Sequence, residues 1–311
     1  MRLGGYRTSD NVRDQGAGGG GFGFGGGGGG GGGCLFALLP MVLSRFGIVG
    51  VLVLLLGYCA LTYMGGGGGL GVGGPATTMA PGRQGEGATN NPKEACSRAP
   101  EKRFACQVLA STEDTWTQIF AAKGQRYQPA GFSFYGRNGE SGCGAAQSAM
   151  GPFYCPTDKS IYLDTSFFEE LQTKFGASGD FAQAYVIAHE VGHHIQNLTG
   201  VLDQASSQQR RVSSREGNAI QVRVELQADC YAGVYAATAK DAQGRIMEAG
   251  DVEEGLRAAQ AIGDDTLQRQ SQGRVVPEAF THGSSAQRQQ WLKRGLESGD
   301  PAACDTFGSG V

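Results

Sequence analysis

Residues 188–194 read Ala188-His189-Glu190-Val191-Gly192-His193-His194 and contain the pattern H-E-x-x-H. Residues four apart lie on one face of an α-helix, so His189 and His193 can offer two imidazole nitrogens to a single metal ion. Glu190 follows the first histidine, and its carboxylate would project beside the metal, where it can take a proton from a bound water. The stretch therefore predicts a metal site on a helix, with Glu190 as the general base.

The sequence around this motif has the features of a helix. Asp180 follows a Ser-Gly pair and is predicted to be the N-cap. Apolar residues then recur at helical spacing as a buried stripe, formed by Phe181, Ala184, Ala188, Val191, Ile195 and Leu198. The chain has only four histidines, and two of them occupy the ligand positions. His194 points about 100° away from His193 on the helix and is predicted either to support a ligand from behind or to be structural, rather than to bind the metal itself.

A third ligand is predicted at Glu225. Residues 218–238 have the apolar spacing of a second helix, carried by Ile220, Val224, Ala228, Tyr231, Val234 and Tyr235. Two histidines and one glutamate form a known catalytic zinc set with one open position for water. Asp229 lies one turn beyond Glu225 and can accept the spare ring N–H of a ligand histidine. The alternative is that both carboxylates are solvated charges, but their neighbours are apolar.

Three motifs together resemble a known family. They are A-H-E-V-G-H-H-I-Q at 188–196, V-E-L-Q-A-D-C-Y-A-G at 224–233 and F-T-H-G-S-S-A-Q-R at 280–288. The set is similar to the bacterial family called "putative neutral zinc metallopeptidases" (YpfJ-like), and H-E-V-G-H with a later E-x-x-x-D resembles the gluzincin metallopeptidases. The resemblance implies an α+β, mainly helical zincin-like domain with a small sheet, preceded by one transmembrane helix. It implies Zn2+ and peptide-bond hydrolysis, but no particular substrate.

The chain of 311 residues divides by composition into four parts. Residues 1–45 are predicted to be a disordered cytoplasmic tail, because the run 16–33 is almost entirely glycine. Residues 46–64 are 19 uncharged, mostly apolar residues, long enough to cross a bilayer as a signal anchor. Residues 65–95 are predicted to be a flexible linker and 96–311 the folded domain. A net charge of −3 argues against nucleic acid as a partner.

Charges around residues 46–64 predict the orientation of the chain. Four arginines precede this stretch, namely Arg2, Arg7, Arg13 and Arg45, and the next charged residue is Arg83. The positive-inside rule then places the N-terminus in the cytoplasm and the domain outside the cytoplasmic (inner) membrane. A buried core helix and a cleaved signal peptide are the alternatives. The glycine-rich flanks and the distance from the N-terminus disfavour them.

The predicted domain contains six cysteines, which in an extracytoplasmic domain indicate disulfides. Fifteen pairings are possible for six cysteines, and the sequence does not select one. Neighbour pairing is our choice, giving Cys96–Cys106 and Cys143–Cys155 and leaving Cys230 for Cys304. Zinc binding by cysteine is disfavoured because no C-x-x-C spacing occurs.

Further segments are predicted to surround the metal site. Residues 94–122 are predicted to form a helix, and the polar stretch 199–216 a loop over the site. Residues 160–164 are predicted to form a strand, with two alternatives left open. It is either an edge strand that pairs with extended substrate or an interior strand.

His282 precedes a predicted helix that runs to about residue 296. A histidine in this position can reach into a cleft and stabilise a tetrahedral oxyanion. The alternative is a histidine that only bonds the backbone at the helix start.

Three functions follow from these features. The first is a membrane-anchored zinc peptidase that acts on peptides or proteins. The second is a catalytically silent, zinc-stabilised binding domain, and the third a glycine-rich scaffold protein of the cell envelope. Glu190 favours the peptidase, because a purely structural zinc site has no use for a general base.

Overall fold

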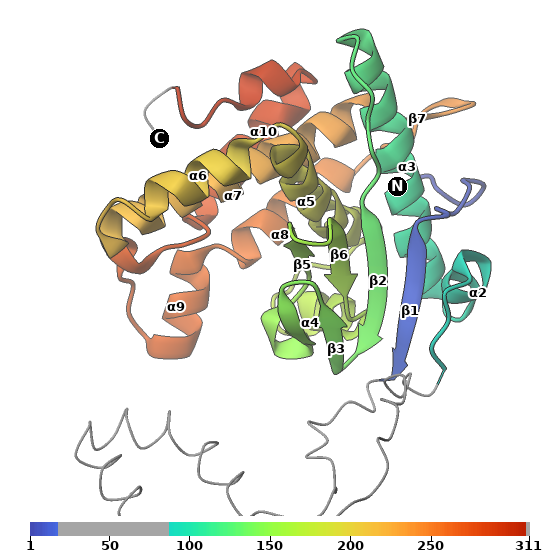
Figure 1. The fold of residues 1–311 in the computed structure, drawn as a ribbon, viewed down its shortest axis with the longest axis horizontal. Coiled ribbons are helices and arrows are strands. Elements are labelled where there is room, and N and C mark those ends of the chain that lie inside the picture. The colour runs from blue at the N-terminus through green and yellow to red at the C-terminus, as the bar shows by residue number, and fades with distance from the viewer. Residues whose placement is uncertain (18–86, 309–311) are drawn as a thin grey trace, which may run out of the picture. The chain divides into compact units, whose positions relative to one another are not determined.

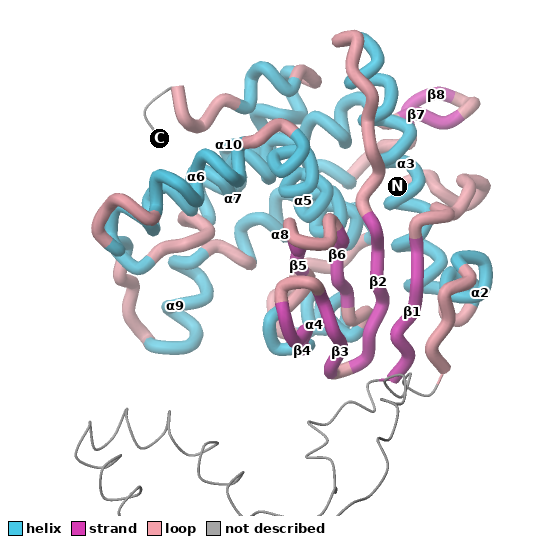
Figure 2. Tube along the Cα trace, viewed as in Figure 1, coloured by secondary structure: helices cyan, strands magenta, loops and turns pink. Residues whose placement is uncertain are grey.

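A mixed sheet forms one side of the computed structural model, which describes residues 1–17 and 87–308 (Figures 1 and 2). Its strands follow the order β4-β3-β2-β6-β5, and β1 also pairs with β2. They are β1 (Val12–Ala17), β2 (Gly131–Gly136), β3 (Asn138–Ser141), β4 (Gly144–Gln147), β5 (Phe153–Cys155) and β6 (Ser160–Leu163). Strands β1 and β6 run parallel to β2, whereas β5 runs antiparallel to β6. Strands β2 and β6 are interior strands with a neighbour on each edge, and most of their residues are buried.

Helices make up most of the rest, so the fold is α+β and mainly helical, as predicted. They are α2 (Pro92–Ser97), α3 (Pro100–Ala122), α4 (Ser166–Thr173), α5 (Asp180–Leu198), α6 (Val201–Gln209), α7 (Ser214–Thr238), α8 (Asp251–Ala261), α9 (Asp264–Gln272) and α10 (Ser285–Ser298). Helix α5 packs against β5, β6 and α3, and α7 and α8 pack against α5. Helix α10 then packs on α7 and α8 (Figure 1). Helix α5 is therefore surrounded, and α7 is its neighbour across the site.

Two glycines allow the helices that flank the site to approach closely. A Cβ on Gly192 would lie 2.9 Å from the Ala228 backbone, so the glycine inside H-E-V-G-H permits the contact of α5 with α7. A Cβ on Gly295 would lie 1.9 Å from the Cys230 carbonyl oxygen, so α10 also requires a glycine to reach α7. Real Cβ atoms do not come this near to backbone atoms, and substitution at either position would push the helices apart.

The N-terminal segment is part of the folded domain. Met1, Leu3 and Val12 are buried in the main core, and β1 pairs with β2 from Val12↔Phe132 to Ala17↔Gly136. The buried Asp14 carboxylate accepts hydrogen bonds from Arg98 and Lys102 of the helical layer, at 3.2 and 2.6 Å. The prediction of a disordered tail is therefore wrong for residues 1–17, because these residues contribute a strand and core side chains.

This pairing constrains the membrane topology. Residues 1–17 and 87–308 belong to one unit, so they must lie on the same side of any membrane. The predicted arrangement, with residues 1–45 in the cytoplasm and the domain outside, conflicts with the β1–β2 pairing. The predicted membrane span 46–64 and most of the predicted linker 65–95 fall outside the described residues. Within the two described ranges, no helix has the length and apolar character needed to cross a bilayer.

Three other predicted elements differ in detail. The predicted helix 94–122 is two helices, because Pro100 cannot continue the hydrogen-bond ladder of α2 and instead begins α3. The predicted strand is β6, and it is the interior alternative that holds, with β5 at the edge. The predicted loop 199–216 contains helix α6, which nevertheless lines the site as expected.

The cysteines pair as predicted, in Cys96–Cys106, Cys143–Cys155 and Cys230–Cys304. The first bridge joins α2 to α3, and the second joins the β3–β4 turn to the edge strand β5. The third ties α7 to the C-terminal segment. Gln227 of α7 strengthens this link by donating to the Cys304 carbonyl at 3.0 Å.

Candidate metal centre

Helices α5 and α7 bring three ligand atoms together. Oε2 of Glu225 lies 3.2 Å from Nε2 of His189 and 3.5 Å from Nε2 of His193. A tetrahedral zinc ion with bonds of about 2.1 Å has ligand atoms about 3.4 Å apart. The two distances to Glu225 match this spacing, and the ligand atoms of His189, His193 and Glu225 all lie within 4.8 Å of one another, so the predicted ligands suit a zinc ion. All three are largely buried.

The other ring nitrogen of each histidine meets an acceptor. Nδ1 of His189 lies 2.8 Å from Oδ1 of Asp229, as predicted for that carboxylate. Nδ1 of His193 lies 2.8 Å from Oε1 of Gln196, a partner that we did not predict. Because both acceptors require an N–H at Nδ1, we assign the neutral rings as Nδ1-H tautomers. This assignment leaves the Nε2 lone pairs facing each other and Glu225, as a metal requires.

Gln196 belongs to a buried chain of amides. Its Nε2 donates to the Val224 carbonyl at 2.7 Å and to Oε1 of Gln227 at 3.0 Å. With its amide N–H groups engaged in this way, the Gln196 oxygen must face His193. The sequence did carry a signal for this contact, because Gln196 lies three residues after His193 on the same helix.

The carboxylates of the site have distinct environments. Burial opposes ionisation of Glu225, but the charges and hydrogen bonds of His193 and His189 in their protonated forms prevail and hold the pKa of Glu225 well below the usual range. The pKa of His189 rises to about 10, because Asp229 and Glu225 outweigh the effect of burial. Burial raises the pKa of Glu190. A glutamate with a raised pKa suits a residue that must accept a proton and then release it.

A cavity of about 610 Å³ opens onto these residues. The three ligands, Glu190 and His282 all lie in its wall. Edge strand β5 contributes Phe153 and Tyr154, and α6 contributes Leu202 and Ala205. Further apolar lining comes from Met150, Phe167, Phe175, Val186, Ile262 and Leu267. The candidate site is thus a polar cluster on one side of a mainly apolar cleft.

His282 reaches this cavity from the segment before α10, as predicted. Its side chain is 52% exposed, and its Nδ1 lies 3.3 Å from Oδ1 of Asp264. The hydrogen bond with Asp264 raises the pKa of His282. Oδ2 of Asp264 also accepts the backbone N–H groups of Thr281 and His282, each at 2.6 Å. One carboxylate thus holds both the ring and the backbone of His282.

His194 has a structural role, as predicted. Its side chain is fully buried, its Nδ1 lies 3.0 Å from the Tyr154 hydroxyl, and its Nε2 donates to the Gln128 carbonyl at 2.7 Å. Burial lowers the pKa of His194, so the ring is neutral. The contact joins the metal-binding helix to the edge strand β5.

Two further side chains surround Asp229 and were not predicted. The hydroxyl of Tyr185 donates to Oδ1 of Asp229 at 2.6 Å, and Arg288 donates to both Asp229 oxygens. Tyr185 lies one turn before His189 on α5, so its place near the site follows from helix spacing. Arg288 lies on α10, which no local pattern relates to the metal helix.

A buried pair of histidines and a glutamate on two packed helices, beside an edge strand and a cleft, is the kind of ligand arrangement that catalytic zinc sites use. The chain belongs to the family described as "Putative neutral zinc metallopeptidase", whose model matches residues 1–307.

Relatives of known sequence support the same membership. The chain is 54% identical over 209 residues to "Uncharacterized protein YpfJ" of Escherichia coli K12. The aligned region covers 67% of this chain and 72% of that protein. It is 46% identical over 222 residues to "Uncharacterized protein Mb2605" of Mycobacterium bovis, covering 67% of this chain and 73% of that protein. No solved structure matches the chain.

Proposed function

We propose that this chain is a zinc-dependent peptidase that hydrolyses peptide bonds in the cleft between β5, α5 and α6. The observation that carries the proposal is the spacing of the three ligand atoms, at 3.2 and 3.5 Å from the shared Glu225 oxygen. Membership of a zinc metallopeptidase family agrees with it.

A zinc ion bound by these residues would act as a Lewis acid and lower the pKa of a water in the open position. Glu190 then accepts a proton from the attacking water at its carboxylate and delivers it to the leaving amine. No hydrogen bond from another described residue ties up the Glu190 carboxylate, so it is free to bond water and substrate. His282 faces the same cavity and donates a hydrogen bond from its ring to the oxyanion.

The proposed substrate is an extended peptide lying along β5. Strand β5 pairs with β6 on one side, and its other edge has no partner strand among the described residues. A free strand edge binds an extended peptide by backbone hydrogen bonds, while side-chain pockets supply selectivity. This role, which we first considered for 160–164, moves to β5 because β6 is interior.

We also propose that the domain works outside the cytoplasm and is held at the inner membrane through 46–64, which would then enter and leave the membrane on the same side, because residues 1–17 and 87–308 form one unit. Three disulfides support an oxidising compartment. Under this proposal, residues 1–17 lie on the same side as the catalytic residues.

The test compares substitutions in the purified full chain. Replacing His189, His193 or Glu225 with Ala should remove most bound zinc and all hydrolysis of an unbiased peptide library. Glu190→Gln should keep near-stoichiometric zinc and lose about 10²–10⁴-fold in rate. Glu170→Gln is a matched control, because Glu170 lines the same cavity without joining the metal cluster.

The contrast between the Glu190 and Glu225 variants decides the assignment. Loss of zinc in Glu190→Gln together with its retention in Glu225→Ala would show that the ligand set is wrong. If the unsubstituted chain holds zinc but cleaves no peptide, the catalytically silent zinc-stabilised binding or scaffold domain becomes the function.

A further inference from the structure

Arg288 is the most deeply buried cation near the site among the described residues, and the proposed reaction gives it no role. Its side chain is 3% exposed. Its Nε and Nη2 each donate to a different Asp229 oxygen at 2.9 Å, in the planar two-bond geometry that arginine forms with carboxylates. Nη2 also donates to the Tyr185 hydroxyl at 3.2 Å. Asp229 is fully buried and in turn accepts from His189.

A second set of contacts links Arg288 to the His282 side of the cleft. Nη1 donates to the carbonyl of Ile262 at 3.3 Å, at the corner between α8 and α9. The neighbouring Gly263 approaches α10 so closely that a Cβ there would lie 2.4 Å from the Ser285 nitrogen. Asp264, the next residue, holds the backbone and ring of His282. Arg288 therefore bonds the same α8–α9 corner that holds His282 in place through Asp264.

We propose that Arg288 is a positioning residue that fixes the His189 ring through Asp229 and the His282 segment through Ile262. This inference rests on the zinc set proposed above. It gives a role to an arginine that is 3% exposed and pairs with a fully buried carboxylate. Together with a zinc ion, its charge balances the three carboxylates Glu190, Glu225 and Asp229, which would otherwise leave net negative charge in the core.

The experiment measures zinc affinity rather than activity. In the purified full chain, Arg288→Gln should raise the zinc dissociation constant by about 10–100-fold, the usual effect of losing a residue that orients a metal ligand. Chelator competition gives this constant. The visible spectrum of the Co2+-loaded protein should also change, because a freed His189 ring alters the ligand geometry. The backbone amides of Thr281 and His282 both donate hydrogen bonds to Asp264. Their hydrogen exchange should become faster in the variant.

Matched variants separate positioning from general destabilisation. Arg294→Gln is the control, because Arg294 is an exposed arginine on the same helix that stacks on Trp291. It should leave zinc affinity, the Co2+ spectrum and the amide exchange unchanged. Arg288→Lys keeps the buried charge but cannot bond both Asp229 oxygens and Ile262 at once. It should weaken zinc binding as well, and it carries the test if Arg288→Gln does not fold.

Two results would overturn the inference in distinguishable ways. Unchanged zinc affinity and Co2+ spectrum in a folded Arg288 variant, beside tight binding by the parent, would overturn this inference alone. Failure of the unsubstituted chain to bind zinc would overturn the proposed function and this inference with it.

Discussion

Deletion of residues 1–17 is the change that best separates a folded N-terminal strand from a dispensable tail. Three side chains of this segment, Met1, Leu3 and Val12, are 8%, 2% and 3% exposed. Burial of such side chains stabilises a protein by about 1.5–3 kcal/mol each, so their loss removes roughly 5–9 kcal/mol. That range is an upper bound, because unfolded chains already bury part of this surface. Small domains have only about 5–15 kcal/mol of stability, so the truncated domain should lose most or all of its stability.

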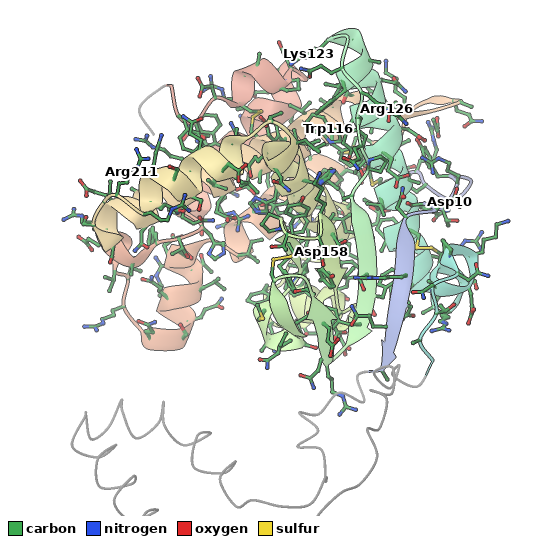
Figure 3. All side chains as sticks on the ribbon, viewed as in Figure 1. Asp10, Trp116, Lys123, Arg126, Asp158 and Arg211 are labelled. Carbon is green, nitrogen blue, oxygen red and sulfur yellow. A yellow bond between two sulfur atoms is a disulfide. The ribbon has the colours of Figure 1, made fainter. Side chains whose placement is uncertain are left out.

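The comparison needs two soluble proteins that differ only in this segment. One contains residues 87–311, and the other joins residues 1–17 to 87–311 through six Gly and Ser residues. A short linker suffices because Asp14 and Thr89 exchange backbone hydrogen bonds of 2.8 and 2.7 Å, and six extended residues span about 20 Å. Urea unfolding is followed by the fluorescence of the buried Trp116 and Trp291. Trp116, which is labelled in Figure 3, lies in helix α3.

The joined protein should unfold in one cooperative transition and bind zinc. The truncated protein should show no transition or a strongly reduced midpoint, and should aggregate. Equal midpoints and equal urea dependence for the two proteins would refute the reasoning, because residues 1–17 would then contribute nothing to the core.

Three further predictions concern topology, disulfides and pH. Single cysteines can be placed at the exposed Asp10 and Lys123 after Cys34 and Cys59 are replaced by Ser (Figure 3). Both should react with a membrane-impermeant maleimide added on the same side of the membrane. Labelling from opposite sides would contradict the β1–β2 pairing. Replacing Cys230 and Cys304 with Ala opens a loop of 74 residues and should lower the free energy of unfolding by about 4.5 kcal/mol. Opening the 12-residue loop of Cys143 and Cys155 should lower it by about 2.8 kcal/mol. Urea unfolding measures both losses, and a reversed order would argue against the loop-entropy reasoning. Asp264 raises the pKa of His282, so protonated His282 persists to higher pH and its donor is lost as pH rises through that pKa. Asp264→Asn should therefore shift the alkaline limb of kcat/KM to lower pH, and an unchanged limb would mean that the charge of His282 has no part in catalysis.

The metal cluster could be predicted because its geometry is local. Helix spacing alone places His189, Glu190 and His193, and the same spacing on a second helix relates Glu225 to Asp229. The structure only had to bring α5 and α7 together. Arg288 could not be placed in this way, since its contact with Asp229 depends on how α10 packs on α7 across a Gly295–Cys230 approach that no periodic pattern encodes.

Elements with few apolar residues, or beside the glycine tract, were the least predictable. Residues 12–17 were grouped with the glycine tract, because the position that the structure buries at Asp14 is charged and the stretch shows no apolar alternation. Helix α6 was predicted as a loop because it is polar and buries only Ala205 fully. Packing against α5 and α7 stabilises it, and that information is not local.

The predicted orientation conflicts with the β1–β2 pairing, and the structure gives three of its arginines another role. Arg2 pairs with Asp241, and Arg7 pairs with both Glu113 and Asp114. Arg13 donates to the Tyr162 hydroxyl at 2.8 Å across the sheet. The positive-inside rule applies to arginines in short loops beside a membrane span, where the charge itself resists translocation. Arginines that form ion pairs and hydrogen bonds within a folded domain contribute to that domain's stability instead. Without these three residues only Arg45 remains before the predicted span, so charge no longer decides the orientation, and the disulfides become the stronger argument for the compartment.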